Sequence, residues 1–231
     1  MWAGKLDHGS PPMAPARGGR LVAACRGRGA RDASPRCGYG EHVLTDHDAA
    51  FSYAGGLLVG DQVRLRGTRD DDIQTLARWM MEPEIRATQS NIVLPLSEAA
   101  TRELIAGWSK NEGTDVGFSI ETLDSDRLVG HTGLFGGGVK DRRRIAGIFI
   151  GRPFLDRGYG TDAMRLLVSY GFRELGLHRV ELTVLAFNAR AIAAYRKVGF
   201  VEEGRARQAV FHDGHWYDEV SMAILADEWR S

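Results

Sequence analysis

The sequence predicts a mixed α/β domain that follows an N-terminal extension. Residues 1–40 are rich in Gly, Pro, Ala and Arg and show neither helical nor strand periodicity. Three strand-like runs with short polar connections occupy the middle of the chain, and helical apolar spacing alternates with strands only after them. This order is typical of a mixed sheet with flanking helices, and it differs from a series of βαβ units.

The composition is that of a soluble globular protein. Hydrophobic residues make up 43% of the 231, with five Trp and nine Phe, which is enough for a core. Thirty Lys and Arg balance thirty Asp and Glu, so no overall field favours nucleic acid or an anionic membrane as a partner. No run approaches the roughly eighteen apolar residues of a membrane-spanning helix. The two cysteines, Cys25 and Cys37, fit a reducing compartment, and we expect a cytoplasmic protein.

We expect residues 1–56 to form an extension that is disordered or poorly structured, and the folded domain to span residues 57–231. A segment rich in Gly and Pro cannot bury enough apolar surface to offset the entropy of ordering it. Residues 41–60 are transitional, and "FSYAGGLLVG" has room for a short strand or helix.

The first part of the domain reads as one strand and two helices. "QVRLRGT" alternates Val63 and Leu65 with polar residues, as a strand does. A helix follows with Thr68 or Asp70 as its N-cap, and Pro83 ends it. Its apolar face is formed by Ile73, Leu76, Ala77 and Met80. A second amphipathic helix begins after Ser97.

The remaining elements are three strands, then helix, strand, helix and two strands. The short connections "DSD" and "GGGVKDR" predict antiparallel hairpins among the first three strands, and Asp213-Gly214 turns the last two. The expected ranges are strands at 116–123, 127–135 and 144–151, a helix at 160–176, a strand at 179–186 and a helix at 188–200.

The window "GIFIGRPFLDRGYGTDAMRLL" carries the strongest chemical signal. Gly158 and Gly160 open a helix shortly after a strand. The first turn of a helix leaves several amide N–H groups unpaired at the positive end of the macrodipole, and glycines let a phosphate approach them. Arg157 could add a charged contact and Thr161 a hydroxyl. The window therefore predicts a pyrophosphate cradle, with ordinary turn chemistry as the alternative.

A dinucleotide-binding fingerprint is a second interpretation of the same glycines. Gly158-x-Gly160-x-x-Ala163 fits that fingerprint and would predict a nicotinamide-dependent oxidoreductase. The intervening "RPFLD" and the preceding hairpins argue against it, because the fingerprint follows its strand directly within βαβ units. The acidic residue expected about twenty positions later is poorly matched, since Glu181 lies inside the next strand.

Several motifs in order resemble the GCN5-related N-acetyltransferase (GNAT) superfamily over about residues 62–229. They are "GIFIGRPFLDRGYGTDA" and "LTVLAFNARAIAAYRKVGFVEEGRAR". "LARWMMEPEI" and "HDGHWYDEVSMAIL" resemble the branch of ribosomal-protein N-terminal and polyamine acetyltransferases. The resemblance implies a mostly antiparallel central sheet with flanking helices, in which a central parallel strand pair splays apart to admit acetyl-CoA.

The resemblance also implies which residues bind acetyl-CoA. The acyl-CoA signature of the family falls on residues 155–160, with Leu155 as a departure at its first position. The strand end would pair its backbone with the pantetheine arm, the following amides would bind the pyrophosphate, and Asn188 would contact the cofactor or cap the next helix. The implied binding residues are Phe149, Ile150, Gly151, Arg157, Gly158, Tyr159, Gly160, Thr161 and Asn188.

For catalysis the resemblance implies direct transfer of the acetyl group to a primary amine in a ternary complex, without a metal. Tyr195 matches the general acid that protonates the departing thiolate, although its spacing also fits a core aromatic. The backbone N–H near Ile150 would stabilise the oxyanion. Glu84 is a candidate general base or an ordinary loop carboxylate, and Glu181 is a second candidate base or part of a salt bridge.

The acceptor stays open among a protein N-terminus, a polyamine and other small amines. A homodimer is expected from the resemblance alone. Two further classes remain as alternatives: a non-catalytic acyl-CoA-binding or regulatory domain, and the oxidoreductase. His212 and His215 flank a turn without companion ligands, which is weak evidence for zinc, so no metal is expected.

Overall fold

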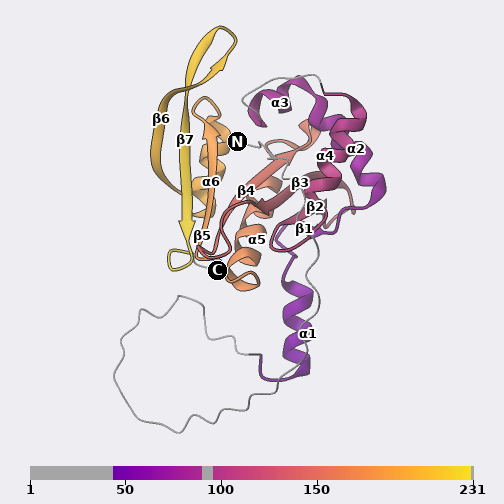
Figure 1. The fold of residues 1–231 in the computed structure, drawn as a ribbon. Coiled ribbons are helices and arrows are strands. Elements are labelled where there is room, and N and C mark those ends of the chain that lie inside the picture. Colours follow the sequence, from indigo (N-terminus) through magenta and orange to yellow (C-terminus); the bar gives the residue numbers. More distant parts are fainter. Residues whose placement is uncertain (1–43, 90–95, 230–231) are drawn as a thin grey trace, which may run out of the picture.

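The structure is a computed structural model that describes residues 44–89 and 96–229. We expect disorder in the N-terminal extension, and its residues 1–43, which include Cys25 and Cys37, lie outside the described ranges. Most of the described chain forms one sheet with helices on both faces (Figure 1).

The sheet has seven strands in the order β1-β2-β3-β4-β5-β7-β6. Only β4 and β5 pair in parallel, and every other neighbouring pair is antiparallel. This confirms the predicted mixed, mostly antiparallel α/β fold. The strands are β1 Val63–Arg66, β2 Val116–Thr122, β3 Leu128–Phe135, β4 Arg143–Ile150, β5 Arg179–Leu185, β6 Val201–His212 and β7 His215–Leu225.

Helices cover both faces of the sheet. On one face α5 and α6 pack over a large apolar core, and on the other α2 and α4 enclose a smaller cluster that includes Phe149 of β4. Figure 1 shows α2, α3 and α4 grouped together at one side of the domain. The helices are α1 His47–Gly56, α2 Asp70–Met81, α3 Pro83–Gln89, α4 Glu98–Trp108, the 3-10 turn η1 Arg152–Phe154, α5 Tyr159–Arg173 and α6 Ala189–Val198.

The start of α2 differs from the prediction. Neither Thr68 nor Asp70 is its N-cap, because the helix begins after Arg69. The Arg69 amide donates instead to Asp72 Oδ2 (2.8 Å), which also accepts from Ser119 Oγ (3.0 Å). The side chain of the third helical residue thus satisfies the backbone amide of the N-cap residue, which is one half of a capping box.

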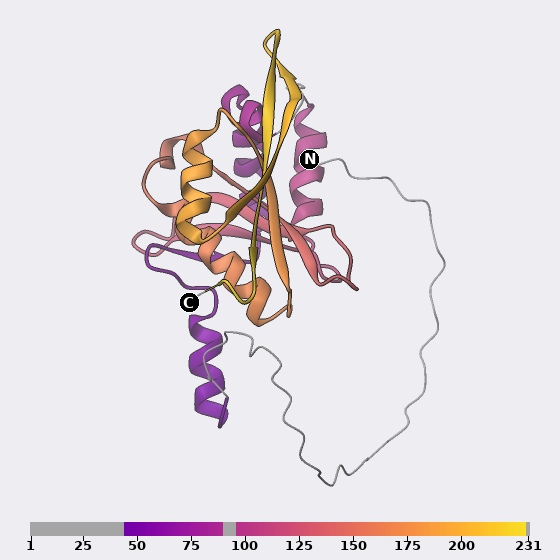
Figure 2. The same ribbon diagram turned by 90° about the vertical axis from the view of Figure 1, so that its left-hand side faces the viewer.

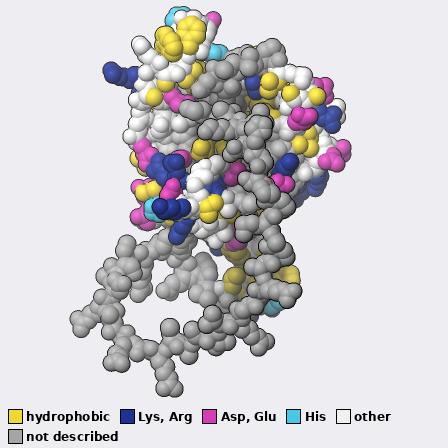
Figure 3. Space-filling view, in the orientation of Figure 1, with side chains coloured by type: hydrophobic (Ala, Val, Ile, Leu, Met, Phe, Trp, Pro, Cys, Tyr) yellow, Lys and Arg dark blue, Asp and Glu magenta, His cyan; other side chains and the backbone are white. Residues whose placement is uncertain are grey.

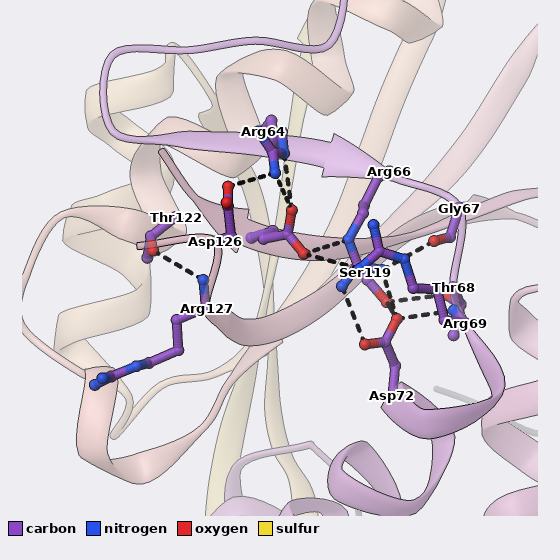
Figure 4. Close-up of polar contacts among 11 residues, drawn as sticks. Arg64, Arg66, Gly67, Thr68, Arg69, Asp72, Ser119, Thr122, Asp126 and Arg127 are labelled. Carbon is purple, nitrogen blue, oxygen red and sulfur yellow. Dashed lines mark hydrogen bonds and ion pairs between the residues drawn. The ribbon is translucent and has the colours of Figure 1, made fainter. Parts of the chain in front are cut away.

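A network of charged side chains fastens this helix start to the sheet (Figure 4). Arg66 of β1 donates to Asp72 (2.6 Å) and to Glu121 of β2. Arg64 donates to the same Glu121 and to Asp126 (2.6 Å). Glu121 is only 1% exposed, so two guanidinium groups compensate a buried carboxylate.

One helix was not assigned from the sequence, and another overlaps the stretch at 51–60 where a short strand or helix was allowed. Pro83 ends α2, as expected, but it also begins α3, since proline suits the first helical position. Glu84 therefore lies in the first turn of a helix and not in a loop. Residues 47–56, which we placed in the extension, form α1 without a buried residue. The Tyr53 hydroxyl of α1 donates to Glu174, and Arg173 lies over its ring.

The hairpin of β6 and β7 extends beyond the rest of the sheet (Figure 2). Hydrophobic side chains gather at its tip (Figure 3). Phe211 and Trp216 face each other across the hairpin with ring centroids 5.2 Å apart, and they are 54% and 59% exposed. The predicted turn at Asp213-Gly214 is confirmed.

Candidate functional site

A cavity of about 620 Å³ opens where β4 and β5 separate. The two strands pair only from Arg143 to Ile145 and from Arg179 to Glu181. Beyond these pairs β5 bonds to β7 alone, and both strand ends line the cavity. The splayed parallel pair that the family resemblance implies is therefore present. The start of α5, residues of α6 and part of α3 complete the lining.

The backbone of β4 offers hydrogen-bonding groups to this cavity at Ile150. The Gly151 amide donates to Val129 of β3 (2.9 Å), so the neighbouring pair of Gly130 and Ile150 is of the non-hydrogen-bonded kind. The N–H and C=O of Ile150 consequently point away from β3, toward the gap that β5 has left. By the same alternation, Phe149 directs its polar groups to β3.

Gly151 itself does not line the cavity. A Cβ at this position would lie 2.8 Å from Trp79 Cδ2, so the glycine permits the Trp79 ring to pack on the chain here. The same ring meets Phe154 edge-on, with centroids 5.6 Å apart. Gly151 is thus a packing contact between α2 and the turn after β4, whereas Phe149 and Ile150 line the cavity.

The glycine loop forms the predicted cradle at the start of α5. Gly158 is the N-cap and adopts the left-handed conformation (φ 87°), which favours glycine. Its carbonyl accepts from the amides of Thr161 and Asp162. The amides of Tyr159 and Gly160 have no acceptor among the described residues, so they are available to an anion at the helix N-terminus. The exposed Arg157 and the half-buried Thr161 also line the cavity.

Asn188 caps the next helix, as the sequence allowed, and it also lies at the cavity. Its Oδ1 accepts from the Ala191 amide (3.2 Å), which caps α6. The same residue lines the cavity beside Leu185, the last residue of β5.

Tyr195 lines the cavity from α6. Its ring packs near Phe200 (centroids 5.9 Å apart), and no described residue hydrogen-bonds its hydroxyl. Burial raises the pKa of Tyr195 to about 12, because ionisation would place a phenolate in an apolar surrounding. The phenol therefore keeps its proton at neutral pH.

The two carboxylates that the sequence pointed to lie in different places. Glu84 lines the cavity from α3 and forms an ion pair with Arg152 (2.9 Å), and both side chains are well exposed. Glu181 is not among the lining residues. It pairs with Arg143 (3.1 Å) and Arg179 (2.7 Å) at the closed end of the strand pair, which is the salt-bridge alternative.

Glu219 is a lining residue that the sequence reasoning missed. It lies half-buried on β7, opposite Leu185 of β5, and no described residue makes a hydrogen bond or ion pair with its carboxylate. The sequence offered only one signal for this residue, a glutamate placed directly before Val220 and the largely apolar second half of β7. Only the pairing of β5 with β7 shows that this glutamate faces the cavity.

The described residues contain neither a metal-binding group nor a helix that could span a membrane. Residues 44–89 and 96–229 contain no group of three His, Cys, Asp or Glu side chains that could hold a metal ion. His215 Nδ1 contacts the Asp213 carbonyl (2.7 Å), and His212 stacks on Phe187. Within the same ranges, no helix is both long and apolar enough to cross a membrane.

Comparison with known families decides the classification. Residues 62–201 match the acetyltransferase (GNAT) domain family. The chain belongs to this family. Probable N-acetyltransferase YjcK of Bacillus subtilis is 38% identical over 111 residues, which cover 47% of this chain and 60% of YjcK. Putative ribosomal N-acetyltransferase YdaF of the same organism is 28% identical and covers 74% of this chain and 96% of YdaF.

A solved structure shows that the fold is shared as well. The spermidine N-acetyltransferase of Vibrio cholerae, in complex with CoA and spermine, superposes with a TM-score of 0.65 at 24% identity, over 72% of this chain and 97% of that one. This GNAT protein is an acetyltransferase, and the nicotinamide-dependent and non-catalytic alternatives are set aside.

Proposed function

We propose that this GNAT protein transfers the acetyl group of acetyl-CoA directly to a primary amine in a ternary complex. The proposal rests on the observation that three features line the same cavity. A backbone edge at Ile150, a helix N-terminus with free amides and the protonated Tyr195 all line the space between β4 and β5. Acetyl-CoA would bring an activated thioester to this cavity.

The described residues fit such a molecule. The C=O of Ile150 can accept a hydrogen bond from an amide of a pantetheine arm, as it would from an added strand. The free amides of Tyr159 and Gly160 suit the pyrophosphate, and Arg157 and Thr161 lie beside them. A Cβ at Gly160 would lie 3.4 Å from Ile150 Cγ1, at van der Waals contact, so the start of α5 packs against the strand end.

The reaction forms a C–N bond and breaks the C–S bond of the thioester. A protonated amine gives up one proton to a base before it attacks and a second one as the amide forms. The sulfur leaves as a thiolate that gains one proton, so the net reaction releases one proton to solvent. The Ile150 N–H can donate to the carbonyl oxygen as negative charge develops on it. Tyr195, protonated because of its raised pKa, can donate to the departing sulfur.

We propose Glu219, ahead of Glu84, as the group that receives the amine proton. An alkyl amine has a pKa near 10.4 and is protonated at neutral pH, so it needs a base before it attacks. The Glu84 carboxylate is exposed and already paired with Arg152, so it is not free to contact an amine. Glu219 is half-buried and free of charged partners among the described residues.

The proposed acceptor is a protein N-terminus, a polyamine or another small amine. The support is the presence of N-acetyltransferases with both kinds of name among the similar proteins. The homodimer expected from the family resemblance stays a prediction, and light scattering of the purified protein tests it.

The test begins with binding and continues with turnover. Calorimetry should show micromolar binding of acetyl-CoA to the protein, and Gly158→Glu should abolish it, because the new carboxylate would occupy the anion site with a strained backbone. Release of free thiol is then measured with a panel of N-terminal peptides, polyamines and small amines. A folded protein that binds no acetyl-CoA contradicts the proposed function.

A further inference from the structure

The start of α5 is held in place by a carboxylate that points away from the cavity. Asp162, in the first turn of α5, is 5% exposed. It accepts hydrogen bonds from three consecutive backbone amides that lead into β1: Asp61 to Oδ1 (3.3 Å), Gln62 to Oδ2 (2.8 Å) and Val63 to Oδ2 (3.1 Å). About a hundred residues of sequence separate the two segments.

The loop before β1 is shaped to receive this carboxylate. A Cβ added to Gly60 would lie 2.7 Å from both oxygens of Asp162, closer than any side chain allows. A Cβ on Gly158, the N-cap of α5, would likewise meet Gln62 Nε2 at 2.8 Å. Residues 60–63 therefore lie against both Asp162 in the first turn of α5 and Gly158 at its N-cap.

The charge of Asp162 needs this shielding. A carboxylate in the first turn of the helix that receives a pyrophosphate would repel the pyrophosphate if it faced the same side. Three amides donate to its carboxylate on the opposite side, and charge-assisted hydrogen bonds of this kind are stronger than neutral ones. The amides of Tyr159 and Gly160 are left free toward the cavity.

We propose that Asp162 is a positioning residue, which fixes the amides of the glycine loop for the pyrophosphate by anchoring α5 to residues 61–63. The inference rests on the proposed function, because it presumes that the cavity takes a CoA ester. Asp162 does not touch the CoA ester, and its effect is confined to the nucleotide half of CoA.

The test compares CoA with pantetheine, which lacks the nucleotide and the pyrophosphate. In Asp162→Asn the dissociation constant of CoA, measured by calorimetry, should rise on the order of ten- to hundredfold, because small displacements of binding groups have large effects. The dissociation constant of pantetheine, measured by its competition with CoA, should stay within about twofold of the wild-type value. Equal losses for both ligands, or no loss for CoA, would overturn the proposal.

Two further variants separate positioning from general damage. Gly60→Ala leaves the charge of Asp162 intact but displaces its carboxylate, so it should reproduce the selective loss of CoA binding. Asp72→Asn is the matched control, because Asp72 is equally buried (6% exposed), lies in the first turn of α2 and accepts a backbone amide, yet does not line the cavity. It should bind CoA as the wild type does.

Hydrogen exchange of the ligand-free proteins completes the test. The amides of residues 157–163 should exchange faster in Asp162→Asn than in the wild type or in Asp72→Asn. This readout needs no CoA. A wild type that binds no CoA while these amides respond as expected contradicts the proposed function but not the anchoring, whereas unchanged exchange contradicts the anchoring.

Discussion

Arg152 Nη1 lies 2.9 Å from Glu84 Oε1, and this ion pair joins the first turn of α3 to the turn that follows β4. Arg152 thus engages the Glu84 carboxylate, which the sequence pointed to as a candidate base. Glu219, on the opposite side of the β4–β5 gap, has no such partner among the described residues. The two glutamates therefore give different expectations for the same isosteric change.

Glu219→Gln should lower kcat on the order of a hundredfold or more at pH 7, since general base catalysis typically contributes that much. The defect should shrink as the pH approaches 10, because the amine then loses its proton to solvent. Glu84→Gln should lower kcat by less than about threefold, because it removes only an exposed ion pair. Thiol release measured across this pH range checks both, and the opposite ranking would return the base role to Glu84.

Tyr195→Phe should lower kcat on the order of a hundredfold while the dissociation constant of CoA stays within about twofold. The variant loses only a hydroxyl that no described residue hydrogen-bonds, so the fold should be preserved. Because burial raises the pKa of Tyr195 to about 12, its ionisation should not reduce the wild-type rate below about pH 11. Unchanged turnover in the variant would assign Tyr195 to the core alone.

Local patterns made the glycine loop and the helix caps predictable. Gly158 needs a left-handed conformation, Ser97 and Asn188 cap their helices, and each signal lies within a few residues of the element that it controls. The splayed strand pair came from the family resemblance and not from periodicity, because no local pattern says where β5 leaves β4.

The remainder of the site depends on contacts between distant segments. Glu219 faces the cavity only because β7 pairs with β5, and Asp162 finds its donors about a hundred residues earlier in the chain. Pro83 permits two interpretations, the end of one helix and the first residue of the next, and the chain uses both. A single sequence carries no signal that distinguishes such pairings.

Glu121→Gln should destabilise the protein at pH 7 by on the order of 1–2 kcal/mol, because the hydrogen bonds from Arg64 and Arg66 lose their charged acceptor while both arginines keep a second carboxylate, Asp126 and Asp72. Burial alone would raise the pKa of Glu121, but hydrogen bonds from Arg66 and Arg64 outweigh it and lower that pKa below its usual value. The stabilisation is therefore present above about pH 4.5 and is lost as the pH falls through the lowered pKa.

Urea unfolding of wild type and variant at pH 7 and at pH 3 measures this difference, which should be smaller at the lower pH. Asp126→Asn is the control, since Asp126 is an exposed partner of Arg64 and its loss should cost less than about 1 kcal/mol. A variant as stable as the wild type at pH 7 would show that the network in Figure 4 does not stabilise the fold.

His131 should make the fold sensitive to mild acid. It is 2% exposed on β3, its ring stacks near Phe149, and its Nε2 lies 2.9 Å from Ser109 Oγ. Burial lowers its pKa to about 4, although the charge of Asp72 acts in the opposite direction. The unfolded chain takes up a proton near pH 6.5 and the folded chain does not, so the free energy of unfolding should fall from pH 6.5 toward pH 4, by about 3 kcal/mol from this residue.

His131→Gln keeps a polar group near Ser109 but cannot take up a proton in this range. Its free energy of unfolding should therefore depend less on pH between 6.5 and 4 than that of the wild type, even if the variant is less stable at pH 7. Urea titrations at four or five pH values in this window compare the two slopes. The window lies largely above the one expected for Glu121, so the two contributions can be told apart. Equal slopes would show that His131 is protonated in the folded protein as easily as in the unfolded chain.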